Sequence, residues 1–335
     1  MDSSERFSTI WFGRNEPDEP PGGGRWHQRI RPWSADSTAG LVLLGFAVDE
    51  GVRRNEGRVG AAAGPAAIRS ILRNSPCSHE GPLWDAGDVE CPAGDLEGAQ
   101  LDLANRIAGI LARGGRPIVL GGGHEMAWGS FQGCCANWQA TESLLVINMD
   151  AHLDLRVPQG NAPLQGNASL QGNASPQGNS GTAFFQMAQW CRASGRPMQY
   201  SAFGISQFAN TRGLFERAAQ QNVQYILDEE LQTASQLTEA KRHLQEQLSR
   251  HDRVYLTICL DVLPAAVAPG VSAPAALGVP LANIEPLLDL VAESGKLVVA
   301  DIAELNPPLD RDHQTARVAA RMVARLARRW RPRTT

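Results

Sequence analysis

The sequence predicts an α/β fold with three layers, in which a mostly parallel sheet of about eight strands lies between two layers of helices. Two observations predict this fold. Short, nearly continuous apolar runs alternate with amphipathic helical patterns along most of the 335 residues. Three of these runs also end in metal-binding residue types, as expected where parallel strands end together at one edge of a sheet.

The expected strands are apolar runs bounded by turn residues. They are Leu41–Ala47, Leu83–Val89, Pro117–Leu120, Ser143–Asp150, Gln199–Gly204, Val223–Leu227, Val254–Asp261 and Lys296–Ala300. The helices expected between them are Pro65–Arg73, Leu96–Arg113, Ala183–Ala193, Leu214–Gln220, Ser235–Leu248 and Leu281–Ser294. End signals support several helices, for example Asp95 at an N-cap position and Gly114 with Gly115 after a C-terminus.

We expect residues 1–39, rich in Pro, Gly and Trp, to form an irregular N-terminal arm. Residues 40–330 are expected to form a single catalytic domain. Within it, residues 159–179 repeat the motif Gln-Gly-Asn with a period of six. A β-solenoid needs more repeats to bury a core, and these residue types bury little apolar area, so the repeat is interpreted as a flexible loop insertion.

The bulk properties exclude several classes of partner. The net charge of −4 and the pI near 6.0 argue against nucleic-acid binding. The basic run from Arg317 to Arg333 is interpreted as an amphipathic helix with a solvated arginine face rather than an RNA-binding tail. No apolar run approaches the ~20 residues of a membrane span, and no signal peptide is visible. The six cysteines match neither a zinc ribbon nor a disulfide scaffold, so a cytoplasmic protein is expected.

The motif Asp150-Ala-His152-Leu-Asp154 carries the most chemistry, because it follows an apolar strand and places metal-binding side chains at alternate positions. Carboxylates with one imidazole suit Mn²⁺ or another hard-to-borderline dication. Two further strand ends offer similar groups: three glycines followed by His124, and the run Val254–Asp261. Together the three motifs predict one metal cluster at the carboxyl edge of the sheet.

These residues resemble the arginase/ureohydrolase family, whose patterns are G-G-[GD]-H, D-A-H-x-D, [ST]-x-D-x-D and D-I-x-E-x-N-P. All four occur here in order, the last as Asp301–Pro307, and the match spans most of the chain. Within the family, the segments Asp49–Arg58 and Gly122–Gly129 resemble formiminoglutamases specifically, while Ala268–Ala273 is shared more broadly.

The resemblance implies an arginase-like fold and a centre of two Mn²⁺ ions. It assigns His124 and Asp154 to one ion and His152 and Asp261 to the other, with Asp150 bridging both. It also implies that Glu304 holds a planar cationic group of the substrate and that Asp154 passes a proton to the leaving amine. The remaining substrate contacts that we expect are Ser180, Gly181, Thr182, Arg54, Asn55, Asn210 and Arg212.

Cys259 departs from the family pattern, which places aspartate at both 259 and 261 and uses the first to bridge the two ions. A thiolate is a soft ligand and lacks the second oxygen that lets a carboxylate span two metals. We therefore expect the second ion, held by His152, Asp150 and Asp261, to bind weakly. A single-metal or zinc-bearing centre is the alternative outcome.

The activity implied by the resemblance is hydrolysis of N-formimino-L-glutamate to L-glutamate and formamide in histidine degradation. One alternative is another ureohydrolase, either an agmatinase or a guanidino-acid hydrolase. The other is a metal-poor pseudoenzyme that acts as a binding protein, which the cysteine at position 259 motivates. A small-molecule substrate is expected, with no nucleic acid and no membrane, and homo-oligomers remain open.

Overall fold

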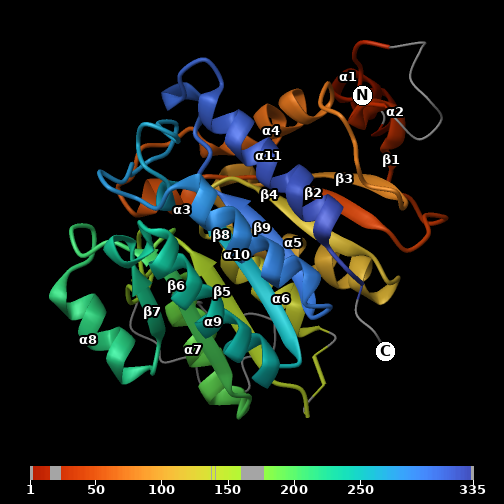
Figure 1. The fold of residues 1–335 in the computed structure, drawn as a ribbon. Coiled ribbons are helices and arrows are strands. Elements are labelled where there is room, and N and C mark those ends of the chain that lie inside the picture. The colour runs from red at the N-terminus through yellow and green to blue at the C-terminus, as the bar shows by residue number, and fades with distance from the viewer. Residues whose placement is uncertain (1–2, 16–23, 137, 140, 160–176, 333–335) are drawn as a thin grey trace.

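The computed structural model describes residues 3–15, 24–136, 138–139, 141–159 and 177–332. Within them, nine strands form one parallel sheet in the order β1-β3-β2-β4-β9-β8-β5-β6-β7 (Figure 1). Their bounds are β1 Arg31–Pro32, β2 Leu41–Ala47, β3 Leu83–Glu90, β4 Arg116–Gly121, β5 Leu144–Met149, β6 Met198–Ile205, β7 Gln224–Leu227, β8 Arg253–Cys259 and β9 Leu297–Ala303. The predicted α/β class is confirmed, with the short edge strand β1 in addition.

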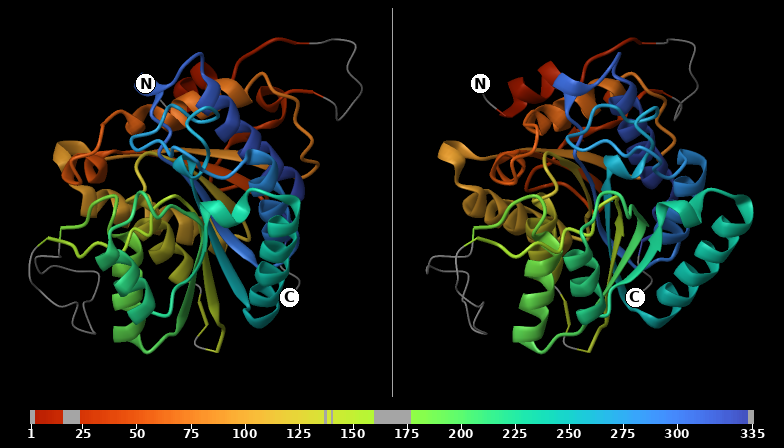
Figure 2. Two further views of the ribbon diagram at one scale, coloured as in Figure 1. Left: turned by 60° about the vertical axis from the view of Figure 1, so that its left-hand side comes forward. Right: turned by 90° about the vertical axis from the view of Figure 1, so that its left-hand side faces the viewer.

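Helices cover both faces of the sheet (Figure 2). The α-helices are α1 Ser3–Ile10, α2 Trp26–Arg29, α3 Glu50–Arg54, α4 Gly64–Leu72, α5 Leu96–Ala112, α6 Met126–Cys135, α7 Ala183–Ser194, α8 Arg212–Gln220, α9 Ala234–Arg250, α10 Leu281–Glu293 and α11 Gln314–Arg329. Short 3₁₀ turns lie at Ala61–Ala63, Pro92–Gly94, Asp228–Leu231, Leu260–Val262 and Pro307–Leu309. Side chains of α4, α9, α10 and α11 pack in the core on one face, and those of α5 to α8 pack on the other.

The central strands are buried on both faces, which explains their continuous apolar sequences. In β2, Leu41 and Leu43 join the core under α4 and α11, while Val42 and Leu44 join the core under α5 and α6. All four side chains are fully buried. Alternation along a strand therefore divides one apolar run between two cores.

The N-terminal segment, predicted as an irregular arm, contains α1, α2 and β1 and is anchored to the domain. The indole of Trp11 is buried and donates to Asp85 Oδ2 at 2.6 Å. Asp85 in turn accepts two hydrogen bonds from the fully buried Arg69 at 2.8 Å. Trp26 is also buried. Phe7 and Ile10 of α1 pack beside these aromatic anchors, but an eight-residue helix is too short for its apolar pattern to repeat, so the sequence did not reveal it.

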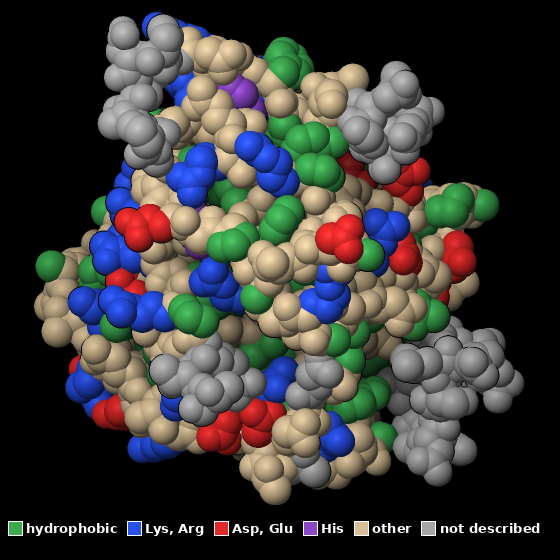
Figure 3. All heavy atoms as spheres, turned by 90° about the vertical axis from the view of Figure 1, so that its right-hand side faces the viewer, with side chains coloured by type: hydrophobic (Ala, Val, Ile, Leu, Met, Phe, Trp, Pro, Cys, Tyr) green, Lys and Arg blue, Asp and Glu red, His purple; other side chains and the backbone are tan. Residues whose placement is uncertain are grey.

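The arginines of α11 fasten this helix to α10 as well as meeting solvent. Arg321 and Arg325 both pair with Glu285, Arg325 also pairs with Asp289 at 2.6 Å, and an arginine one turn later continues the series. These ion pairs between α11 and α10 therefore involve several of the arginines that the sequence analysis interpreted as a solvated face. On the face of the molecule shown in Figure 3, basic and acidic side chains are interspersed.

Most of the predicted Gln-Gly-Asn loop, residues 160–176, lies outside the described residues. Its two ends are described, and they pair. The backbone N–H groups of Gln159 and Gln177 each donate to the carbonyl of the other, at 3.2 and 2.8 Å. The insertion therefore begins and ends at one point of the domain. Among the described residues, no helix has the length and apolarity that crossing a membrane requires.

Candidate active site

Four adjacent strands at the centre of the sheet, β4, β9, β8 and β5, end at the same edge. Each delivers one residue with a possible chemical role. His124 follows β4, Asp150 follows β5, Cys259 ends β8 and Glu304 follows β9. Because the strands are parallel and neighbouring, their carboxyl ends bring these side chains together, as the sequence predicted.

The Asp150–Asp154 motif converges through a loop rather than through strand alternation, because β5 already ends at Met149. Asp154 has a left-handed backbone with φ of 46°, an uncommon conformation outside glycine. The Asn210 side chain holds this loop, since its Oδ1 accepts from Leu153 N at 2.9 Å and its Nδ2 donates to Ala151 O at 2.8 Å. The loop conformation turns Asp154 back toward His124.

Gly122 and Glu304 close the other side of the site. A Cβ on Gly122 would lie 2.0 Å from the carbonyl oxygen of Val48, so only glycine lets the end of β4 approach β2 so closely. The Gly122 carbonyl accepts from Glu304 N at 2.8 Å, and Glu304 has a φ of 71°. Its Oε1 accepts from His124 N at 2.8 Å. These bonds hold a strained residue in place and aim its carboxylate at the cluster.

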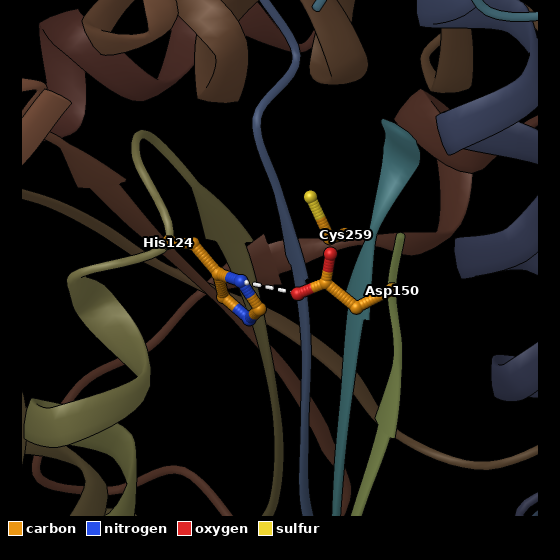
Figure 4. Close-up of side chains that lie close together, drawn as sticks. All are labelled: His124, Asp150 and Cys259. Atoms are coloured by element: carbon orange, nitrogen blue, oxygen red, sulfur yellow. Dashed lines mark ion pairs between the residues drawn. The ribbon is translucent and has the colours of Figure 1, made fainter. Parts of the chain in front are cut away.

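Asp150 lies between two histidines in the cluster. Its Oδ2 is 3.0 Å from His124 Nδ1, and its Oδ1 is 3.5 Å from His152 Nδ1. Asp154 Oδ2 also lies 3.0 Å from His124 Nδ1, and Asp261 Oδ2 lies 3.0 Å from His152 Nδ1. The side chains form two groups that share Asp150 and could each hold an ion, one with His124 and Cys259 (Figure 4) and one with His152 and Asp261.

The environment of His124 fits a metal ligand. Its Nε2 is 2.9 Å from the hydroxyl of Thr257, whereas its Nδ1 is buried and makes no hydrogen bond although it faces two carboxylates. A neutral imidazole that donates from Nε2 presents a lone pair at Nδ1, which is the state that a metal ion binds. The residues at this site therefore fit a divalent cation.

A pocket with a volume of ≈ 280 Å³ opens onto the cluster. Its lining includes ten of the residues predicted from the sequence, which are Asn55, His124, Asp150, His152, Asp154, Ser180, Asn210, Cys259, Asp261 and Glu304. The lining also includes two arginines, Arg58 and Arg156. The buried part of the lining is thus acidic, whereas the two arginines are exposed to solvent.

A model of the arginase family matches residues 39–328. The chain belongs to the arginase family. Its relatives include a formimidoylglutamase from Ralstonia nicotianae, 48% identical over 331 residues that cover 96% of each chain. Another is a formimidoylglutamase from Aeromonas hydrophila, 46% identical over 320 residues that cover 95% of this chain and 96% of the relative.

Solved structures of the arginase family share the fold. The crystal structure of Trypanosoma cruzi formiminoglutamase with Mn²⁺ matches with a TM-score of 0.72 and 26% identity, covering 88% of this chain and 95% of that one. Formimidoylglutamase from Bacillus subtilis matches with a TM-score of 0.77 and 19% identity, covering 95% and 94%. The family resemblance and the arginase-like fold predicted from the four motifs are confirmed.

Three of the predicted substrate contacts are engaged elsewhere in this arginase-family chain. Arg54 lies in an adjoining outer pocket, where it pairs with Glu97 at 2.6 Å and with Glu50. Arg212 points to solvent with 92% of its side chain exposed. Thr182 is buried, and its hydroxyl donates to Asn179 O at 2.9 Å at the start of α7.

Gly181 does not line the inner pocket either, but its carbonyl accepts from Arg156 N at 2.9 Å and so supports a residue that does. Sequence reasoning missed Arg156, although it continues the alternation of Asp150, His152 and Asp154. It also missed Thr257, whose hydroxyl contacts His124. A threonine in an apolar strand gives no separate signal of such a contact.

The two histidines of the arginase-family cluster have strongly shifted pKa values. Burial lowers the pKa of His124, but the Asp150 and Asp154 carboxylates outweigh burial and raise it well above the usual range. The pKa of His152 is also raised well above the usual range, since Asp261 and Asp150 outweigh burial. Protons on these imidazoles balance the carboxylates when no cation is bound, so metal ions and protons compete for the same atoms.

The carboxylates of the site respond to burial and to one another. Burial raises the pKa of Glu304 to about 8, and the neighbouring Glu125 adds to this effect. Burial also raises the pKa of Glu125 to about 7. The pKa values of Asp154 and Asp261 are raised by burial and by the charge of Asp150. Such an excess of buried acid favours the binding of cations.

Proposed function

We propose that this protein hydrolyses N-formimino-L-glutamate to L-glutamate and formamide, a step of histidine degradation. The relatives named above are formimidoylglutamases and match nearly the whole chain. The distribution of charge in the pocket carries the proposal. The carboxylates of Asp150, Asp261 and Glu304 in its lining are buried, whereas Arg58 and Arg156 are exposed to solvent. A substrate with a cationic amidine at one end and two carboxylates at the other matches this distribution.

Glu304 binds the amidinium in this proposal. Its carboxylate is buried, is fixed by the His124 N–H group at 2.8 Å and lines the pocket. A planar N–C–N cation forms paired, charge-assisted hydrogen bonds with such a carboxylate. The same cation favours the ionised form of Glu304, which burial alone disfavours.

The carboxylate end of the substrate meets the arginines. Arg58 is oriented by hydrogen bonds from Nε to Ser272 O at 2.8 Å and from Nη2 to Val271 O at 2.9 Å. Within the described residues, the guanidinium of Arg156 forms no hydrogen bond or ion pair, so it is available for the substrate. Asn55 donates to Ser180 Oγ at 3.1 Å, and both side chains line the same pocket.

Divalent metal ions are the cofactors that we propose for the two groups around Asp150, with Mn²⁺ at the group of His152 and Asp261. Such a pair of ions would acidify a shared water molecule. Asp154 is placed to accept a proton from that water and to deliver it to the leaving nitrogen. The water oxygen forms a bond to the formimino carbon, the bond from that carbon to the glutamate nitrogen breaks, and the nitrogen takes up the proton. The products are formamide and glutamate.

We also propose that the protein works in the cytoplasm on a small molecule, without a nucleic-acid or membrane partner. All six cysteines are free thiols, which fits a reducing compartment. A homo-oligomer is compatible with this function.

Product analysis tests the proposal. Protein loaded with Mn²⁺ is incubated separately with formiminoglutamate, agmatine and arginine, and formamide and urea are quantified by NMR. We expect formamide from the first substrate and no urea from arginine. Glu304→Gln should abolish turnover while Glu239→Gln, on the exposed face of α9, leaves it unchanged. Release of urea at a higher kcat/KM than formamide would indicate a different ureohydrolase. Retention of metal without either product would indicate a binding protein.

A further inference from the structure

Cys259 gives the two halves of the metal cluster different donor atoms. It ends β8, its side chain is 1% exposed and lines the pocket, and it lies next to the Asp150 carboxylate (Figure 4). The Cys259 Sγ, one ligand atom of His124 and one of Asp150 all lie within 4.8 Å of one another. The other group comprises Asp150, His152 and Asp261, and the Cys259 thiol also contacts the carboxylate of Asp261.

A second observation shows that this position is built for a ligand. His124 Nδ1 is buried, has no hydrogen-bond partner and faces the cluster. Thr257, two residues before Cys259 on β8, holds the opposite ring nitrogen at 2.9 Å. The same strand therefore orients the imidazole and supplies the sulfur. The site also has the carboxylate of Asp154, 3.0 Å from His124 Nδ1.

We propose that the His124 group is a thiolate-bearing site that selects a borderline ion such as Zn²⁺ or Co²⁺ over Mn²⁺. Nitrogen, sulfur and two carboxylates are donors typical of such ions, whereas Mn²⁺ prefers oxygen ligands. On binding, the Cys259 thiol releases its proton to solvent and the sulfur bonds the ion. The sequence predicted that the cysteine would weaken the His152 site, whereas the geometry groups its sulfur with His124 and Asp150. This inference rests on the proposed metal-dependent function.

Cobalt is a direct probe, because a cobalt–thiolate bond gives a near-ultraviolet charge-transfer band that oxygen and nitrogen ligands do not give. Metal-free protein is titrated with Co²⁺ while absorbance and bound metal are measured. We expect the band to develop with the first equivalent, to vanish in Cys259→Ser and to remain in Cys191→Ser, a buried cysteine of α7 outside the site. Co²⁺ bound without the band, or no Co²⁺ bound by the unmodified protein, would refute the proposal.

Competition between metals gives a second test that does not depend on a spectrum. The protein is equilibrated with equal free Zn²⁺ and Mn²⁺, and its metal content is determined by mass spectrometry. We expect Cys259→Asp to lower the preference for Zn²⁺ by about tenfold or more and to raise Mn²⁺-dependent turnover. An unchanged preference in this variant would contradict a sulfur ligand.

Circular dichroism and thermal unfolding of each variant confirm that it folds. If the protein shows the cobalt–thiolate band but produces no formamide, the proposed metal site stands and only the proposed function is rejected. The two proposals therefore fail by different measurements.

Discussion

Replacing Thr257 by valine should weaken metal binding without touching a ligand. The Thr257 hydroxyl interacts with the buried carboxylate of Asp301 and lies 2.9 Å from His124 Nε2. A hydroxyl that donates to Asp301 accepts from the Nε2–H group, which leaves the lone pair on Nδ1. Valine has nearly the same shape but no oxygen. In the variant, either the Nε2–H group stays buried without a partner or the ring takes the tautomer with hydrogen on Nδ1.

Both outcomes disfavour the metal-binding tautomer. A buried donor without a partner costs about 1–3 kcal/mol, and changes behind a metal ligand typically lower affinity by roughly 10- to 100-fold. We therefore expect a loss of metal affinity in that range, measured by competition with a chelating dye at one pH. Thr257→Ser keeps the hydroxyl and should bind within a few-fold of the original protein. If the valine and serine variants bind metal equally well, the hydroxyl does not position His124.

Three further predictions concern substrate, insertion and pH. Arg156→Gln should raise KM for formiminoglutamate by tenfold or more and leave kcat nearly unchanged, because a charge-assisted hydrogen bond contributes about 1.5–3 kcal/mol. Steady-state kinetics check this prediction, with Arg212→Gln as the matched control. Shortening the repeat at 159–179 to one unit should leave thermal unfolding nearly unchanged, because a three- to fourfold change in loop length alters the free energy of loop closure by only ~1 kcal/mol. Stability of the metal-free protein should fall as pH rises through about 7 and about 8, because folded Glu125 and Glu304 hold protons that the unfolded chain releases near 4.5. Thermal unfolding measured at pH 5 and at pH 8.5 should show a smaller fall in stability for Glu125→Gln than for the unmodified protein.

The central strands were predictable because burial on both faces gives them a continuous apolar sequence. Leu41–Ala47 was predicted with the bounds of β2, and the predicted strand Leu83–Val89 differs from β3 by one residue. The helix Glu50–Arg54 was not predicted, because its five residues are too few for an apolar period to repeat. Apolar periodicity in the sequence therefore indicates only those helices and strands that are long enough to bury one side against the core.

The candidate ligands were predictable because the parallel order brings strand ends to one edge. Where a charged side chain points at that edge was not predictable. Arg54 and Arg212 both follow strands on the expected side, yet one pairs with Glu97 and the other with Glu216. Glu216 lies one helical turn after Arg212, so that pair is local. Glu97 lies 43 residues from Arg54, and its position depends on packing that the sequence pattern does not contain. Arg156 faces the pocket instead because Gly181 leaves room for its side chain.

The metal motif also shows how a correct prediction can follow from the wrong local geometry. Alternation in an extended strand was expected to align the ligands, but Asp150 lies beyond β5 and Asp261 lies in the 3₁₀ turn Leu260–Val262. Asp154 and Glu304 both have left-handed backbones, at φ of 46° and 71°. Each such residue costs of order 1–3 kcal/mol, and hydrogen bonds from the surrounding loops hold it there. The spacing of the motif therefore specifies which residues meet, while the strained loops, not the pleat, decide how their carboxylates face the ion.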